Sequence, residues 1–297
     1  MAESGILLID KAADWTSHDV VAKLRGVLGT RRVGHAGTLD PMATGLLVIG
    51  VEQGTRFLTY LVGLDKTYRA TIRLGQSTVT DDAEGELLSA ASPESVVNVT
   101  ETAIDAELAK LTGEIMQVPS SVSAIKVDGK RAYALVRGGD EVKLQARPVT
   151  ISSFDRLAPL RSGVGFIDID VDVTCSSGTY IRALARDLGA ALGVGGHLTA
   201  LRRTRVGRYS VDQASTLENT SVLPLAQAAT EEFPTLELSE QQEIDLRHGK
   251  RIGSAVPSAP AIAGIREGRL VAMLEPAGKS LRSTAVFAIS DAPAAKK

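Results

Sequence analysis

The amino-acid sequence predicts an α+β protein in which strands and helices alternate along the chain. Two stretches, Lys66–Gly75 and Ile167–Cys175, alternate apolar and polar residues, a pattern typical of strands with one buried face. Thr16 begins a helical pattern and forms an approximate capping box with Asp19. A second helix is expected to run to about Leu192, because apolar residues recur there with helical spacing.

Composition restricts the class of protein further. With 297 residues, of which 44% are hydrophobic and 23% charged, the chain fits a soluble globular protein with one large and one small domain. The apolar run Ile6–Ile9 is too short for a membrane span or a signal peptide. The single cysteine, Cys175, fits a reducing cytoplasm. No Cys/His set has metal-ligand spacing, and no phosphate-binding glycine loop is present, so we expect neither a metal nor a cofactor.

The net charge of −2 gives no hint of a nucleic-acid partner, but the charge is unevenly distributed. Residues 176–210 contain six arginines and one acid, whereas residues 216–245 contain seven acids and no basic residue. Such asymmetry can form a local phosphate-binding face on a nearly neutral protein. A solvated surface without a partner explains the same pattern, so the charges alone leave both interpretations open.

One carboxylate, Asp40, lies in a loop that we expect to be held in a fixed shape. Gly34 and Gly37 permit backbone angles or close approaches that a Cβ atom would prevent, and Pro41 pushes Asp40 towards an extended backbone. An apolar strand is predicted to follow at Leu46–Val51. The residues before the loop are basic: Lys23, Arg25, Arg31 and Arg32. An isolated Asp-Pro pair is also ordinary turn chemistry.

A second candidate functional residue is Arg182, in the first turn of the helix for which Thr179 is the candidate N-cap. The helix dipole disfavours a cation at this end, so the guanidinium requires a carboxylate partner. Asp40 is a candidate, but the sequence alone does not rank it above other acids. Asp81 and Asp82 belong to a polar loop, where we expect them to be solvated or to cap a turn.

Three segments resemble, in the same order along the chain, motifs of the TruB family of tRNA pseudouridine synthases. The stretch around Asp40, Gly-His-Ala-Gly-Thr-Leu-Asp-Pro-Met-Ala-Thr-Gly, resembles the family's catalytic signature. The other two are Lys-x-Tyr at Lys66–Tyr68 and Ser-x-Gly-x-Tyr-Ile-Arg at Ser176–Arg182. The resemblance extends from Gly5 to Val211.

The resemblance implies that Asp40, Tyr68 and Arg182 are catalytic, with Arg182 paired to Asp40 and Tyr68 stacked on the target base. It also implies that seven side chains contact the RNA substrate: His35, Tyr68, Tyr180, Leu201, Lys11, Arg202 and Arg203. From the residues alone, a core tyrosine is favoured for Tyr68 and a surface histidine for His35. A core position for Leu201 is compatible with its implied role.

Two motifs depart from the family pattern. The family has Asp-Lys-Pro-x-Gly-x-Thr-Ser, whereas Asp10–Ser17 lacks both the proline and the glycine, which puts the shape of this turn in doubt. In the segment that resembles the family's Gln-x-Pro-Pro, the second proline is replaced by Ser120. We therefore expect a more mobile loop at that position.

The fold implied by the resemblance is an α+β pseudouridine synthase fold, with a mixed, mainly antiparallel central sheet flanked by helices and a small barrel-like domain of the PUA type. We expect a catalytic domain at residues 1–232, with an RNA-gripping insertion at about 117–147. A C-terminal RNA-binding domain is expected at residues 233–290, followed by a disordered tail at 291–297.

The activity implied is conversion of uridine-55 to pseudouridine in the T arm of tRNA, by flipping the uridine and exchanging its C–N glycosidic bond for a C–C bond. Asp40 would act as a nucleophile at C1′ or as a base at C2′, and the sequence does not choose. The T stem-loop of tRNA is then the partner, and we expect a monomeric, cytoplasmic protein without metal or membrane contact. The alternative is a tRNA-binding and tRNA-folding module without catalysis. A guide-RNA-dependent relative is less favoured, because the chain lacks a long lysine-rich tail.

Overall fold

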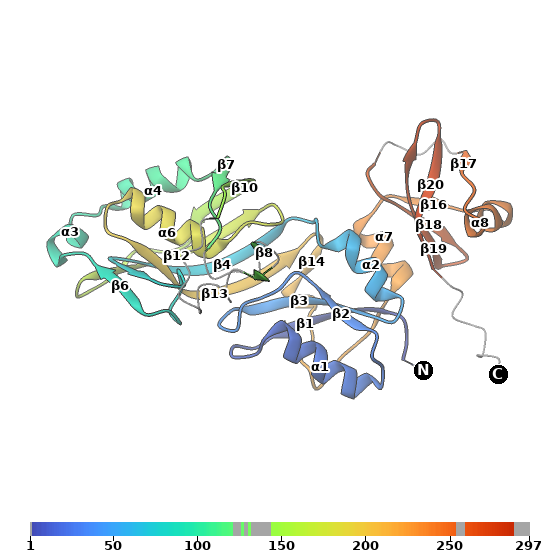
Figure 1. Cartoon of the computed structure of the whole chain (residues 1–297), viewed down its shortest axis with the longest axis horizontal. Coiled ribbons are helices and arrows are strands. Elements are labelled where there is room, and N and C mark those ends of the chain that lie inside the picture. Colours follow the sequence, from blue (N-terminus) through green and yellow to red (C-terminus); the bar gives the residue numbers. More distant parts are fainter. Residues whose placement is uncertain (1, 121–125, 128–129, 132–143, 254–258, 288–297) are drawn as a thin grey trace. The chain divides into compact units, whose positions relative to one another are not determined.

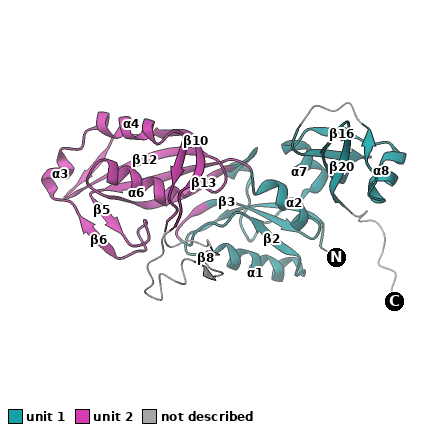
Figure 2. Cartoon of the chain, turned by 45° about the horizontal axis from the view of Figure 1, so that its top comes forward, with its two compact units in different colours: residues 1–41, 45–63, 206–297 teal, residues 42–44, 64–205 magenta. Residues whose placement is uncertain are grey.

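The computed structural model describes residues 2–120, 126–127, 130–131, 144–253 and 259–287. The chain divides into two compact units (Figure 2). The first unit contains residues 1–41, 45–63 and 206–297, and the second contains residues 42–44 and 64–205. Both units combine β-sheet and helices (Figure 1). None of the helices within the described ranges is long and apolar enough to cross a membrane.

The N-terminal sheet of the first unit is built around β1 (Gly5–Lys11), which is antiparallel to β3 (Thr44–Val51) and to β15 (Leu223–Pro224). β3 also pairs with β2 (Val33–Ala36), and the connection between these two strands carries Asp40. The strand predicted at Leu46–Val51 is therefore confirmed and is two residues longer. The sequence indicates a loop where the structure has β2. This strand carries His35.

Two helices of the first unit, α1 (Ser17–Leu28) and α2 (Gly54–Leu61), pack against β2. The capping box predicted for α1 is confirmed. The Thr16 hydroxyl accepts a hydrogen bond from the Asp19 N–H at 3.0 Å, and the Asp19 carboxylate accepts one from the Thr16 N–H at 2.9 Å. Val20 and Leu24 are fully buried, as expected of the apolar face of this helix.

The C-terminal part of the first unit is a curled five-stranded sheet with the strand order β16-β18-β19-β20-β17. Its strands are β16 (Thr235–Glu237), β17 (Ile252–Gly253), β18 (Ile262–Arg266), β19 (Arg269–Ala277) and β20 (Ser280–Val286). Helix α8 (Glu240–Arg247) packs on β20 and begins at a capping box formed by Ser239 and Gln242. Helix α7 (Leu225–Glu232) contacts β1 as well as β18 and β19. The same unit contains β14 (Tyr209–Ser210) and the 3-10 helix η1 (Val211–Gln213).

The second unit contains a sheet with the strand order β13-β4-β12-β10-β7. These strands are β13 (Gly196–Val206), β4 (Lys66–Leu74), β12 (Phe166–Cys175), β10 (Arg147–Arg156) and β7 (Gly113–Gln117), with β11 (Arg161–Gly163) beside β12. Two short hairpins accompany it: β5 (Gln76–Thr78) with β6 (Leu87–Ala90), and β8 (Lys126–Val127) with β9 (Lys130–Arg131). Its helices are α3 (Pro93–Val97), α4 (Glu101–Lys110) and α6 (Ile181–Ala191). Helix α4 packs on β10 and on α6, and α6 packs on β4 (Figure 1).

The alternation predicted for β4 and β12 is confirmed. Residues of β4 from Lys66 to Leu74 are buried at every second position, and β12 follows the same rule. On the polar face, Arg73 forms a bidentate ion pair with Asp168, with both N···O distances 2.8 Å. Cys175 is 1% exposed, and burial raises the pKa of its thiol to about 11. Cys175 therefore belongs to the buried face of β12.

Two predicted features fall largely outside the described residues. The RNA-gripping insertion was placed at about 117–147, of which the structure describes 117–120, 126–127, 130–131 and 144–147. The predicted disordered tail at 291–297 lies outside the described residues.

Candidate functional site

The backbone around Asp40 is fixed on both sides by the segment 11–17. Before Asp40, the N–H of the buried Leu39 donates to the Ser17 hydroxyl at 2.9 Å, and the same hydroxyl donates to the Leu39 carbonyl at 3.1 Å. After Asp40, the Pro41 carbonyl accepts from the Lys11 ammonium at 3.2 Å and from the Asp14 N–H at 3.0 Å. Asp40 itself is half-buried. The loop is therefore held in shape, as the sequence predicts, by residues 22 to 30 positions away.

Lys11 is an internal anchor of this loop. Its side chain is 1% exposed, and its ammonium group donates to the carbonyls of Ala12 at 2.9 Å, Trp15 at 2.6 Å and Pro41 at 3.2 Å. An ammonium group has three protons to donate, and these three carbonyls match that number. Lys11 is therefore buried in this loop, and the implied contact between Lys11 and RNA stays a prediction.

The turn at residues 12–15 keeps a left-handed residue although the family's glycine is missing. Asp14, which stands in the place of that glycine, has φ +65°, a conformation that is rare for side chains other than Asn and Asp. Its N–H makes the hydrogen bond to Pro41. The doubt about the shape of this turn is therefore resolved: Asp14 provides the conformation that connects it to the Asp40 loop.

The glycines of the Asp40 loop play different roles. Gly37 has φ +86°, as a glycine-dependent turn requires. At Gly34 the prediction is wrong, because an added Cβ would meet the nearest side-chain atom, on Leu58, at an ordinary 3.6 Å. His35 is half-buried on β2, and its ring lies edge-on to that of His18, with 5.7 Å between the ring centroids.

In the second unit, Arg182 is buried at the start of α6 and has a carboxylate partner. Its Nη1 lies 3.4 Å from Oδ2 of Asp82, and the two side chains are 7% and 4% exposed. The same nitrogen donates to the Thr80 carbonyl at 2.8 Å. The need for a carboxylate near Arg182 is thus confirmed, with Asp82 as its partner within this unit.

The prediction that Asp81 and Asp82 are solvated is wrong, since both are buried. Asp82 does cap a turn, because its carboxylate accepts hydrogen bonds from the Glu84 N–H at 3.1 Å and from the Thr80 hydroxyl. Asp81 lies 3.4 Å from Arg186. Burial raises the pKa of the Asp81 carboxyl, although this neighbouring cation opposes the shift.

Tyr68 and Tyr180 lie on two different elements of the second unit. Tyr68 is 8% exposed on the apolar face of β4. Tyr180 is the N-cap residue of α6, so the prediction that Thr179 caps this helix is wrong. The Thr179 hydroxyl instead donates to the Ser176 carbonyl at 3.0 Å. The backbone of Tyr180 is bound by Gln117, from β7.

Ser120 is fully buried and hydrogen-bonded, which contradicts the expected mobility at this position. Its hydroxyl donates to the Thr80 carbonyl at 3.3 Å and lies 3.5 Å from Nη1 of Arg182. The serine that replaces the family's proline therefore belongs to the polar network around Arg182. Gln117, Ser17 and Ser120 were not singled out as site residues, because no sequence spacing relates them to partners 22 to 63 positions away.

The three consecutive residues Leu201, Arg202 and Arg203 differ in exposure. Leu201 and Arg202 line a hollow of about 550 Å³, together with Met42, Thr44, Arg69 and Leu157. Arg202 also donates to the Thr44 hydroxyl at 3.4 Å. Arg203 is 1% exposed, so the expected contact between Arg203 and an RNA phosphate has no exposed guanidinium to make it.

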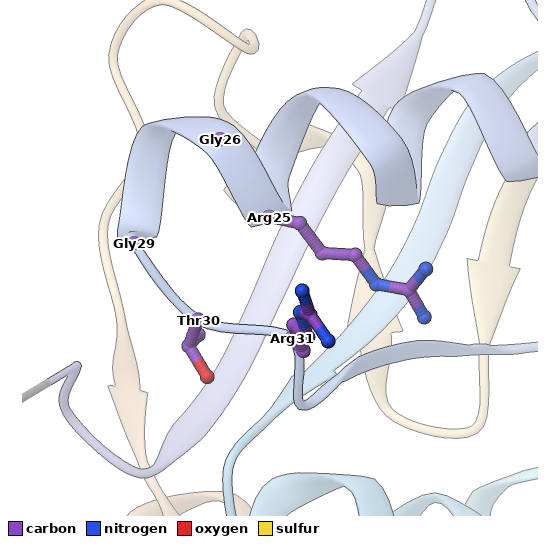
Figure 3. Close-up of a pocket in the computed structure, with 5 residues that line it drawn as sticks. All are labelled: Arg25, Gly26, Gly29, Thr30 and Arg31. Atoms are coloured by element: carbon purple, nitrogen blue, oxygen red, sulfur yellow. The ribbon is translucent and has the colours of Figure 1, made fainter.

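A second hollow of about 550 Å³ lies at the C-terminal end of α1 and is lined by Arg25, Gly26, Gly29, Thr30 and Arg31 (Figure 3). Arg25 projects from the helix and Arg31 from the segment after it (Figure 3). Arg25 donates to the Val33 carbonyl at 3.1 Å, whereas the neighbouring Arg32 is paired with Glu52 at 3.5 Å. Of the four basic residues predicted to gather before the Asp40 loop, Arg25 and Arg31 line this hollow.

Comparisons with known proteins identify the family of the chain. Residues 25–181 match the N-terminal domain of the TruB family pseudouridylate synthases. Residues 182–237 match the C-terminal domain of tRNA pseudouridylate synthase B, and residues 233–288 match the C-terminal region of tRNA pseudouridine synthase II.

Relatives and solved structures agree with these matches. The chain is 58% identical to tRNA pseudouridine synthase B of Arthrobacter sp. (strain FB24), over 97% of this chain and 98% of the relative. It is 57% identical to that of Leifsonia xyli subsp. xyli, over 97% of each chain. A solved Cbf5-Nop10-Gar1 complex is similar in fold, with a TM-score of 0.71 and 23% identity over 97% of this chain and 86% of the other. This likeness confirms the predicted α+β fold, and the chain belongs to the TruB family of pseudouridine synthases.

Proposed function

We propose that this chain converts uridine-55 in the T arm of tRNA to pseudouridine, with Asp40 as the essential carboxylate. The observation that carries the proposal is the double anchoring of the Asp40 loop, in which Ser17 fixes Leu39 and Lys11 fixes Pro41. A reacting carboxylate must be presented in one geometry, since small displacements of a reacting group cost rate. The relatives of this chain are described as tRNA pseudouridine synthases B.

The chemistry requires the target uridine to leave its stack, because the glycosidic bond and C5 are hidden inside a folded RNA arm. Asp40 then acts on the ribose, either as a nucleophile at C1′ or as a base at C2′ that yields a glycal. The C1′–N1 bond breaks, the uracil rotates, and C5 bonds to C1′. The hydrogen at C5 is lost to solvent while N1 takes up a proton, so the reaction is an isomerisation without redox change.

The remaining site residues support this chemistry by binding and charge. We assign Tyr68 to stacking on the flipped base, with Tyr180, His35 and Leu201 around the nucleotide. Arg182 pairs with Asp40 and favours its ionised form, which both roles of the carboxylate require. The ion pair between Arg182 and Asp82 supports this assignment, because it helps to fix the position of the guanidinium.

The substrate is held as the T stem-loop of tRNA, and phosphate contacts come from exposed arginines. Arg202 and Arg31 are the candidates, since each lines a hollow and neither is buried. We further propose that residues 117–147 grip the RNA and that residues 233–290 form a PUA-like RNA-binding domain. The protein would work as a cytoplasmic monomer.

The test is release of tritium from an unmodified tRNA transcript labelled at C5 of uridine. We expect release of one tritium per tRNA, and none above background from a transcript with cytidine at position 55. If neither transcript releases tritium while the protein still accelerates tRNA folding, the alternative of a non-catalytic tRNA-folding module holds. Equal release from both transcripts would contradict the assignment of position 55.

A further inference from the structure

Gln117, the last residue of β7, binds both backbone groups of Tyr180. Its side-chain oxygen accepts a hydrogen bond from the Tyr180 N–H at 2.9 Å, and its side-chain nitrogen donates to the Tyr180 carbonyl at 3.1 Å. Gln117 is 2% exposed, whereas Tyr180 is half-buried. A primary amide is suited to this task, because it presents a donor and an acceptor side by side.

These two hydrogen bonds hold the start of α6, whose N-cap residue has no side-chain capping hydrogen bond. Tyr180 is the N-cap residue, and its own side chain makes no capping hydrogen bond. Its carbonyl also accepts the first helical hydrogen bond, from the Leu184 N–H at 3.2 Å. Gln117 therefore fixes the peptide planes on both sides of Tyr180, and with them the direction of the Tyr180 Cα–Cβ bond.

The residues that follow Gln117 also contact α6. The Val118 carbonyl accepts from Arg186 at 2.7 Å, and the Ser120 hydroxyl lies 3.5 Å from Nη1 of Arg182. Residues 117–120 are thus fastened to the first two turns of α6, which carry Tyr180 and Arg182. The same four residues begin the segment 117–147 that we propose to grip RNA.

We propose that Gln117 is a positioning residue for the reaction, which sets the backbone of Tyr180 and, through the first turn of α6, the guanidinium of Arg182. This inference rests on the proposed roles of Tyr180 and Arg182. It adds a residue that acts through its hydrogen bonds to both backbone groups of Tyr180.

The test compares Gln117→Glu, Gln117→Met and, as a control for the added charge, Gln227→Glu on the exposed face of α7. Single-turnover rates are measured with saturating tRNA between pH 6 and pH 8, each divided by the wild-type rate, together with tRNA affinity. At pH 8 we expect both Gln117 variants to lose about 10-fold to 100-fold in rate, with little change in affinity. The control should match the wild type throughout.

The pH dependence of the relative rate distinguishes a loss of hydrogen bonds at position 117 from a change in side-chain volume. In Gln117→Glu, the ionised carboxylate only accepts hydrogen bonds, whereas the protonated carboxyl group both accepts and donates, as the amide does. Burial raises the pKa of a carboxyl group, so the relative rate of Gln117→Glu should rise as the pH falls, while that of Gln117→Met stays low. A relative rate that is equal to the wild type at pH 8, or that does not rise towards pH 6, would overturn the proposal.

A second measurement does not depend on catalysis. Protein labelled with 3-fluorotyrosine gives a ¹⁹F resonance for Tyr180, assigned with Tyr180→Phe, and this resonance should shift or broaden in Gln117→Met. An unchanged resonance would overturn the positioning role. If Arg182→Lys and Tyr180→Phe both react normally, the proposed roles of those residues are wrong, and the ¹⁹F result still decides whether Gln117 orders Tyr180.

Discussion

The two charged groups assigned to the reaction are anchored in opposite ways. Asp40 is held through its neighbours, since Ser17 binds the backbone of Leu39 and Lys11 binds the carbonyl of Pro41. Arg182 is held through its own side chain, by a buried ion pair with Asp82 and a hydrogen bond to the Thr80 carbonyl. The first anchor is a backbone clamp, and the second is an electrostatic one.

The difference follows from the role that each group is assigned in the reaction. A carboxylate that reacts must keep its oxygens for the ribose, so its position has to be fixed through the backbone. A guanidinium has five N–H donors, so it can bind Asp82, Thr80 and a further partner at the same time. The comparison predicts that variants at the electrostatic anchor change the rate, whereas variants at the backbone clamp change both rate and stability.

The largest effect is expected at the electrostatic anchor. Arg182→Lys keeps the charge but loses the planar, forked geometry that can bind two partners at once, so single-turnover product formation should fall about 100-fold. The matched control is Arg156→Lys, which changes a bidentate pair with Asp105 that has no assigned role in the reaction. If Arg182→Lys converts bound tRNA at the wild-type rate, the assignment of Arg182 is wrong.

The next effect tests the backbone clamp. Lys11→Met leaves the carbonyls of Ala12, Trp15 and Pro41 without their ammonium donor, and unsatisfied buried acceptors cost about 1–3 kcal/mol each before the structure relaxes. We expect a loss of about 2–4 kcal/mol in the free energy of unfolding, measured with urea, together with a reduced rate. Lys110→Met is the control, because that lysine is 69% exposed and its loss should change neither quantity. If Lys11→Met is as stable and as active as the wild type, Lys11 does not hold the Asp40 loop.

A buried lysine of the second unit sharpens the contrast with Lys11. Lys66 donates to the Leu64 carbonyl at 2.5 Å, and burial together with the nearby Arg203 cation lowers its pKa to about 8. The folded protein therefore releases this proton at lower pH than the unfolded chain does. Charged Lys66 costs stability below pH 8, and the cost is relieved as the pH rises from 8 towards 10.5.

Lys66→Met should accordingly be more stable than the wild type at pH 7, and this advantage should shrink above pH 8 by up to about 1.4 kcal/mol per pH unit. Urea unfolding of both proteins at pH 7, 8, 9 and 10 provides the measurement. A difference in unfolding free energy that is constant with pH would show that Lys66 titrates normally.

The smallest effect is expected at the left-handed turn. Asp14→Gly restores the residue that the family usually has, and removes a strain that is modest for aspartate. Against this stands the extra freedom of glycine in the unfolded chain. We expect the free energy of unfolding to change by less than about 1 kcal/mol, with an unchanged rate. Asp14→Val, whose branched side chain is unsuited to φ +65°, should lose both stability and rate.

The sequence predicts those parts of the molecule whose partners are local. The alternation in β4 and β12 and the capping box at Thr16 and Asp19 depend on residues a few positions apart, and both are confirmed. Local patterns do not predict the strand β2, because it has four residues and includes a glycine. A short strand of this kind is defined by its partner β3 and not by its own pattern.

The misses at the site have a common physical cause, which is that the deciding partner is distant in sequence. Thr179 fits the pattern of an N-cap, but Gln117 binds the start of the helix from 63 positions away. Arg203 belongs to a basic cluster and is nevertheless buried. The sequence predicts a mobile loop at Ser120, but in the structure its hydroxyl contacts Thr80 and Arg182. Charge and turn preferences do not contain this information.

The most direct test of the account uses Asp40→Asn, which keeps the shape of the side chain and removes its charge. Because Ser17 and Lys11 bind the backbone on both sides of Asp40, the loop should keep its structure and tRNA affinity should change little. Tritium release in a single turnover should fall by roughly 10⁴-fold or more, as expected when an essential reacting group is removed. Release at the wild-type rate by Asp40→Asn would contradict the central claim that this carboxylate performs the reaction.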